Sequence, residues 1–94
     1  MAKRTRPEDE AWTDYAAQLA TNLRRLRAEA GLSQEDVAYC SGLTRYTYQK
    51  YEKGESKPGT PANPTIRTLL AMSQVLGVAL TDILPADAPD LRLR

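Results

Sequence analysis

The chain has 94 residues, of which 41% are hydrophobic and 27% are charged, and its formal net charge is +1. This length predicts one small domain and excludes two-domain enzymes and large cofactor-binding folds. A domain of this size leaves much of its surface exposed, so a helical bundle with local contacts is easier to stabilise than a deep catalytic cleft. Because alanine is frequent while Val and Ile are few and scattered, the composition favours a small all-α binding domain over a sheet.

The residue types exclude several kinds of chemistry. With one cysteine and no histidine, the chain offers neither an internal disulfide nor the mixed Cys and His ligand sets of zinc sites. The missing histidine also removes the commonest general base. We therefore expect no enzymatic activity, no metal and no cofactor. No apolar stretch has the length of a signal segment or a membrane span, so the expected location is the cytoplasm, at the nucleoid.

The first predicted helix follows from apolar residues that recur at steps of three and four. These residues are Trp12, Ala16, Leu19, Leu23, Leu26 and Ala30. The helix is expected to end at Gly31, which is suited to a left-handed C-terminal position. Residues 1–11 are expected to form a flexible arm. Its basic residues Lys3, Arg4 and Arg6 are compatible with a minor-groove arm, although the acidic cluster that follows disfavours this interpretation.

Two short helices are predicted next, each with a side-chain cap at its start. Ser33 caps the second helix, which ends before Gly42, and Thr44 caps the third, which ends at Gly54. Such a pair, joined by a turn that contains glycine, is the unit in which the second helix can enter the DNA major groove.

The remainder of the chain is predicted as a loop, a helix and a final helical turn. Four residues, Pro58, Gly59, Pro61 and Pro64, predict an exposed loop that holds neither a helix nor a central strand. A fourth helix is expected from Thr65 to Gly77, and a last turn over residues 80–84. Residues 12–84 would then form the domain, and residues 85–94 a flexible tail.

Five segments in this order carry a resemblance to a known family. They are LSQEDVA (32–38), SGLT (41–44), YEKGE (51–55), NPTIRTLL (63–70) and LGV (76–78). Together they resemble the Cro/repressor type helix-turn-helix domain, the XRE family of prokaryotic regulators, over residues 19–84. The resemblance implies a compact five-helix DNA-binding domain of the phage-repressor type, which usually acts as a dimer on an operator with two half-sites.

The resemblance also implies which residues contact DNA. The base-contacting positions fall on Arg45, Tyr46 and Lys50, all expected to be exposed, and positions that touch phosphates fall on Gln34 and Thr44. Free backbone amides at a helix start favour an anion there as well. The complete expected set is Gln34, Thr44, Arg45, Tyr46, Thr47, Gln49, Lys50, Lys53 and Lys57.

Other polar and aromatic residues are assigned structural roles. The family pairs the position of Glu52 with a basic residue late in the first helix, here Arg27, so we expect a structural salt bridge in preference to a catalytic carboxylate. Tyr48 and Tyr51 share the inward face of the third helix and should pack in the core with their hydroxyls at the rim. Arg24 and Arg25 are expected on a solvated face, and Cys40 as a plain small side chain.

Two departures from the family pattern affect the end of the domain. Residues 58–62 look like an insertion, which leaves phosphate contacts there open. Ala79 stands where Ser or Thr commonly caps the last helix. That turn would then depend on a partner chain, which predicts a homodimer through Leu80, Ile83 and Leu84.

The leading hypothesis is a sequence-specific regulator of transcription, a repressor, that reads the major groove of double-stranded DNA with its third helix. The alternative is a protein-interaction module, such as an antitoxin or a polymerase-bridging factor, which uses the same fold to hold a protein partner. The low net charge is compatible with this alternative.

Overall fold

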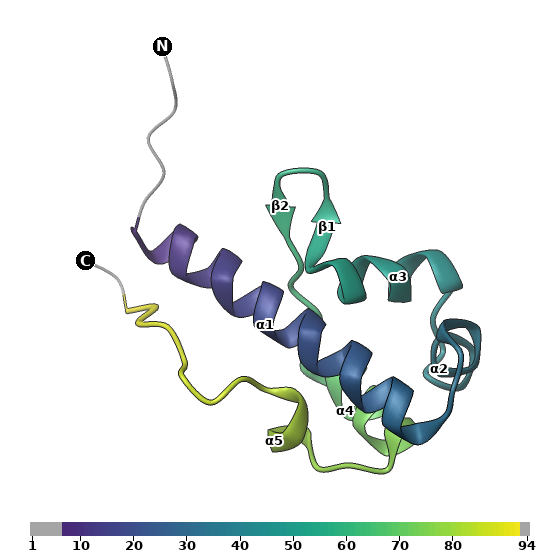
Figure 1. The fold of residues 1–94 in the computed structure, drawn as a ribbon. Coiled ribbons are helices and arrows are strands. Elements are labelled where there is room, and N and C mark those ends of the chain that lie inside the picture. Colours follow the sequence, from purple (N-terminus) through teal and green to yellow (C-terminus); the bar gives the residue numbers. More distant parts are fainter. Residues whose placement is uncertain (1–6, 93–94) are drawn as a thin grey trace.

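Helix α1, Pro7–Ala30, is the longest of the described helices, and most of the later elements pack against it (Figure 1). The computed structural model describes residues 7–92 of the chain. The helix begins five residues before Trp12, so the expectation of a flexible arm is wrong for residues 7–11. Proline is suited to the first helical position, because the N–H that it lacks has no partner there in any helix. The basic residues Lys3, Arg4 and Arg6 lie outside the described residues.

Helices α2, Gln34–Cys40, and α3, Arg45–Lys53, begin at the predicted caps. The Ser33 hydroxyl accepts the Asp36 backbone N–H at 3.0 Å, and the Asp36 carboxylate accepts the Ser33 N–H at 3.2 Å. Thr44 caps α3 by accepting the Thr47 N–H at 3.1 Å. These local bonds satisfy amides that have no partner within the helix, so both starting points are set by nearby sequence.

A two-stranded antiparallel hairpin replaces the expected loop. Strands β1, Glu55–Lys57, and β2, Thr60–Pro61, pair Lys57 with Thr60. The turn between them is Pro58–Gly59, and Gly59 has a φ of 80°. Proline followed by a glycine with positive φ is the combination typical of a type II turn. Pro61 is tolerated because a two-stranded sheet has only edge strands. The all-α prediction is therefore corrected to helices with a small sheet.

Helices α4, Ile66–Leu76, and α5, Leu80–Ile83, complete the fold. The fourth helix begins near Thr65 as predicted, and Thr65 caps it, since its hydroxyl accepts the Thr68 N–H at 3.1 Å. At α5 the Asp82 carboxylate accepts the Ala79 N–H at 3.0 Å, while Ala79 has no side-chain oxygen to complete the cap. No helix or strand follows within residues 84–92.

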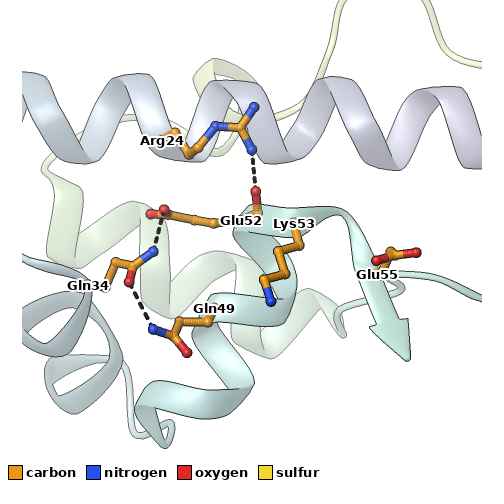
Figure 2. Close-up of a pocket in the computed structure, with 6 residues that line it drawn as sticks. All are labelled: Arg24, Gln34, Gln49, Glu52, Lys53 and Glu55. Atoms are coloured by element: carbon orange, nitrogen blue, oxygen red, sulfur yellow. Dashed lines mark hydrogen bonds between the residues drawn. The ribbon is translucent and has the colours of Figure 1, made fainter. Parts of the chain in front are cut away.

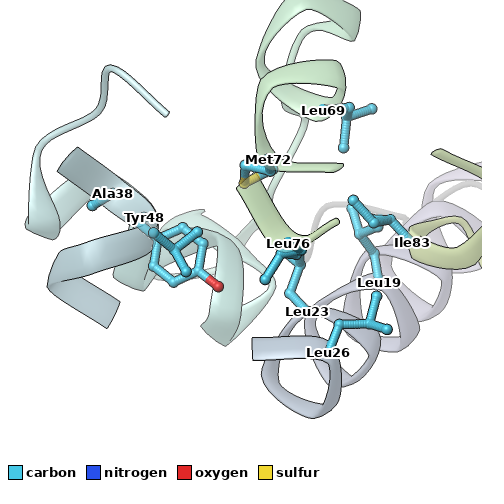
Figure 3. Close-up of a cluster of buried hydrophobic side chains, with 10 residues drawn as sticks. Leu19, Leu23, Leu26, Ala38, Tyr48, Leu69, Met72, Leu76 and Ile83 are labelled. Carbon is cyan, nitrogen blue, oxygen red and sulfur yellow. The ribbon is translucent and has the colours of Figure 1, made fainter. Parts of the chain in front are cut away.

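The core gathers buried side chains from α1 to α5, as Figure 3 shows. Its members are Leu19, Leu23, Leu26, Val37, Ala38, Tyr48, Leu69, Met72, Leu76 and Ile83. Ile83 is fully buried within its own chain, and Leu80 and Leu84 pack against the same core. The expectation that these three side chains form a dimer surface is therefore wrong for Ile83. In α4, Ile66 and Leu70 are exposed, whereas Met72 is buried.

Candidate nucleic-acid interface

The solvent-facing side of α3 carries the residues expected to read bases. Arg45 and Tyr46 are exposed, and the Tyr46 side chain is 69% exposed, as predicted. Lys50 is half-buried, so the expectation that it is exposed is wrong. Its Nζ lies 4.4 Å from the centre of the Tyr46 ring, one helical turn earlier. A cation above an aromatic face is attracted to the ring, which fixes Lys50 and Tyr46 relative to each other.

The opposite side of α3 is buried in the core. Tyr48 is fully buried and Tyr51 half-buried, which confirms that both pack inward. The Tyr48 hydroxyl is not at the rim, however. It lies inside, close to the Glu52 carboxylate, without meeting the geometry of a hydrogen bond. Burial, reinforced by that carboxylate, raises the pKa of Tyr48, so this side chain stays neutral.

Glu52 is the buried charge of α3, with 3% of its surface exposed, and Arg27 of α1 is its partner. Arg27 Nε donates to Glu52 Oε2 at 2.6 Å and Nη2 donates to Oε1 at 3.2 Å. Arg27 Nη1 also donates to the Leu32 carbonyl at 3.0 Å. This two-pronged pairing confirms the expected structural salt bridge and joins α1, the α1–α2 turn and α3.

The ionisation of Glu52 reflects two opposed effects. Burial alone raises the pKa of a carboxyl group. Here the hydrogen bonds from Arg27, together with the polar groups of Tyr48 and Gln34, outweigh that burial, and the pKa of Glu52 lies below its usual value. Glu52 is therefore charged near neutral pH, and its charge is compensated within the protein.

Two glutamines connect this buried carboxylate to the surface of α2 and α3 (Figure 2). Gln34 Nε2 donates to Glu52 Oε1 at 2.9 Å, and Gln49 Nε2 donates to Gln34 Oε1 at 3.1 Å. Both glutamines were expected at the DNA interface. The structure brings them together, half-buried, in a chain of bonds that fixes α3 against the start of α2.

Arg24 has a role that the sequence analysis did not identify. One of its Nη atoms donates to the backbone carbonyl of Glu52, and the other donates to the Thr21 hydroxyl at 3.1 Å. The last carbonyls of a helix have no partner within it, and Arg24 supplies one at the end of α3. The available signal was its spacing, since Arg24 and Arg27 are three residues apart and share a face of α1. Arg25 is exposed and lies 3.5 Å from Glu29.

Two hollows lie along α3. The first has a volume of about 530 Å³ and is lined by Arg24, Gln34, Gln49, Glu52, Lys53 and Glu55. The second, between α3 and the hairpin, has a volume of about 240 Å³ and is lined by Tyr46, Lys50, Lys53, Glu55, Ser56, Lys57 and Pro58. Lys53 borders both. The first lining holds two cationic and two acidic side chains, so its charges balance, whereas the second holds three lysines and one carboxylate.

Residues 7–92 contain neither a cluster of metal ligands nor a helix suited to crossing a membrane. No group of three or more Cys, Asp or Glu residues there is arranged to hold a metal ion. Within the same part of the chain, none of the helices combines the length and the apolar character that crossing a membrane requires.

Similar proteins place this architecture in a family. A model of the helix-turn-helix domain matches residues 18–84. The uncharacterised HTH-type transcriptional regulator y4dJ of Sinorhizobium fredii is 35% identical over 75 residues, which cover 79% of this chain and 90% of that protein. A second relative, the SPbeta prophage-derived regulator YonR of Bacillus subtilis, is 40% identical over 62 residues. That match covers 66% of this chain but only 51% of YonR.

Two crystal structures share the fold. The restriction-modification controller protein C.AhdI from Aeromonas hydrophila superposes with a TM-score of 0.64 at 28% identity, over 73% of this chain and 96% of that one. The hypothetical transcription factor NHTF from Neisseria superposes with a TM-score of 0.65 at 32% identity, over 80% of this chain and 79% of that one. The chain therefore belongs to the helix-turn-helix family of DNA-binding transcription regulators, of the Cro/repressor type.

Proposed function

We propose that the protein is a repressor that binds double-stranded DNA sequence-specifically, with α3 in the major groove. The observation that carries this proposal is the sharp division of α3 into two faces. Tyr48 and Glu52 are buried on one face, while Arg45 and Tyr46 meet solvent on the other. The buried face fixes the direction in which the exposed face points, as base recognition requires.

Each exposed residue of α3 has a proposed partner on DNA. Arg45 donates two hydrogen bonds to guanine O6 and N7, and Tyr46 packs on a thymine methyl group. Gln49, oriented by its bond to Gln34, presents the rest of its amide to an adenine edge. Lys50 approaches the base edge or the adjacent phosphate from above Tyr46.

The phosphate contacts are proposed to flank these base contacts. They involve Gln34 and Thr44 at the helix starts, Thr47 in the first turn of α3, and Lys53 at its end. Such contacts set the register of the protein on the duplex and carry no sequence information directly. A homodimer would place two copies of α3 about 34 Å apart, one turn of DNA, on a palindromic operator.

The experiment that tests this function is the selection of bound sequences from a random duplex pool, performed at two salt concentrations. Phosphate attraction fades as salt rises, whereas base recognition persists as a preference among sequences. Enrichment of a palindrome is the expected result and supplies the operator. Binding without enrichment would contradict base recognition and favour the protein-interaction module, which a pull-down would then address.

Two variants separate base recognition from phosphate binding. Arg45→Ala should weaken binding to the selected operator by about 1–3 kcal/mol and relax the preference at one base pair. Lys53→Ala should weaken binding to selected and random DNA by the same factor. Both side chains are exposed, so neither change should alter folding. Equal losses on selected and random DNA for Arg45→Ala would contradict its role in reading bases.

A further inference from the structure

The first turns of α1 precede the part of the chain that matches the family. The helix begins at Pro7, whereas the helix-turn-helix model matches from residue 18. None of residues 10–15 is buried, and the buried core starts at Ala16. Figure 1 shows this first part of α1 extending past the base of the hairpin. Residues 7–15, the α1 extension, are thus an addition whose order needs its own explanation.

A helical segment of this length has little stability of its own. Isolated helices shorter than about 12–15 residues are marginal in water, and most helical stability in proteins comes from packing against other elements. The α1 extension continues a packed helix and so needs no new nucleus, but its outer turns fray unless another element holds them. Its order therefore depends on a contact with a distant part of the chain.

The residues that follow α5 supply such a contact. Residues 84–92, the strap, run back from α5 toward the start of α1 (Figure 1). Asn22 Nδ2 donates to the Ile83 carbonyl at 2.9 Å and fixes the end of α5 on α1. The Tyr15 hydroxyl then donates to the carbonyl of Pro85, which is buried, at 3.4 Å. The strap is thus attached to α1 at two points that lie two helical turns apart.

Trp12 connects the strap contact to the outer turns of the α1 extension. Its ring stacks on that of Tyr15, with 5.6 Å between the ring centroids and 28° between the planes, and both side chains are half-buried. The bond from Tyr15 to Pro85 is longer than the usual O–H···O distance of about 2.7–2.8 Å. The strap also contains no helix or strand. Its docking is therefore weaker than the packing of the core and can open while the core stays folded.

We propose that the strap is a conformational switch for the α1 extension. With the strap docked on Tyr15, the extension is helical. With the strap released, the extension frays and Trp12 meets solvent, while the domain from Ala16 onward stays folded. The aromatic pair is then exposed next to the place where Ala16 contacts Gly54 at the end of α3. This inference concerns residues outside the matched family domain and does not depend on DNA binding.

The test is the hydrogen exchange of the amides of residues 11–15 in the full chain carrying Tyr15→Ala. Alanine has the highest helix propensity, so exchange would slow if local propensity alone held the α1 extension. The strap predicts the opposite, an exchange about 5- to 10-fold faster, because the hydroxyl bond and the aromatic contact are both lost. Tyr15→Phe keeps the ring and should accelerate exchange by about 2-fold. In that variant acrylamide should quench Trp12, the one tryptophan of the sequence, more strongly than in wild type.

Two controls separate release of the strap from a general loss of stability. Gln18→Ala changes an exposed residue about one turn after Tyr15 and should leave the exchange of residues 11–15 as in wild type. The amides of Leu23 and Met72, both in the core, report on the whole domain and should keep their wild-type exchange in every variant. Unchanged or slower exchange of residues 11–15 in Tyr15→Ala would overturn the proposal. Equal acceleration at Leu23 and Met72 would also overturn it, because the α1 extension would then open only together with the core.

Discussion

Glu52 and Lys53 are neighbours in α3, yet their charges lie in opposite environments. The Glu52 carboxylate is buried and receives hydrogen bonds from Arg27 and Gln34. The Lys53 ammonium is exposed, and the described part of the chain offers it no ion pair. A buried charge without a partner is strongly destabilising, whereas an exposed charge costs little. One helix thus carries both a charge that is compensated inside the protein and a charge that is open to solvent.

The largest expected effect is the removal of the partner of Glu52. Arg27→Ala leaves an uncompensated carboxylate in the interior and should lower the free energy of unfolding by about 3–5 kcal/mol. Urea unfolding measures it. The matched control is Arg25→Ala, an exposed arginine two residues earlier, which should cost less than about 0.5 kcal/mol. If the two variants were equally stable, the contrast between buried and exposed charge would be wrong.

Acid should reproduce part of that loss, because protonation removes the charge of Glu52 but keeps its side chain in place. The pKa of Glu52 is lower in the folded protein than its ordinary value of 4.5. A carboxyl group of this kind contributes stability that is complete above the ordinary pKa and is lost as pH falls through the folded pKa. Between pH 6 and pH 3, wild-type protein should therefore lose more stability than Glu52→Gln does. Parallel pH profiles would show that Glu52 is not the titrating group.

A smaller effect contrasts the fixed base of the hairpin with its open tip. Gly54 and Gly59 have nearly the same positive φ, 78° and 80°. A Cβ on Gly54 would press on the backbone of α1, but one on Gly59 meets nothing within 4 Å. Gly59→Ala should cost about 1 kcal/mol from the strained φ alone, and Gly54→Ala about 2–3 kcal/mol. Chemical unfolding of the two variants measures both losses of stability. An equal loss would mean that the base of the hairpin is not packed against α1.

The sequence predicted those parts of the fold that depend on neighbouring residues. Ser33, Thr44 and Thr65 each accept a backbone N–H three residues later, so α2, α3 and α4 begin where the sequence places them. The pairing of Arg27 with Glu52 came from the family resemblance, because nothing local connects residues 25 positions apart. The DNA contacts themselves stay predictions.

The features that the sequence analysis missed or predicted wrongly depend on contacts between residues that are distant in the sequence. Pro58 and Gly59 signalled a turn, but the strands beside it depend on the bond between Ala62 and Gly54 and on packing against α1. Ile83 is an apolar residue in a predicted helical turn, but the sequence alone does not show whether its own chain or a second copy covers it. The bond from Arg24 to the end of α3 likewise requires two elements to meet in space.

The smallest expected effect is at the start of α5, an element that carries neither of these charges. It tests whether a change in overall stability alters the affinity for DNA. Ala79 begins α5 without a side-chain cap, although Asp82 already supplies the reciprocal bond to its N–H. Ala79→Ser would add the missing acceptor and should raise the free energy of unfolding by about 0.5–1 kcal/mol. Affinity for the selected operator should not change, because α5 contributes to the core through Ile83 and no proposed DNA contact lies on it. A rise in stability with altered DNA affinity would mean that the end of the domain is coupled to α3.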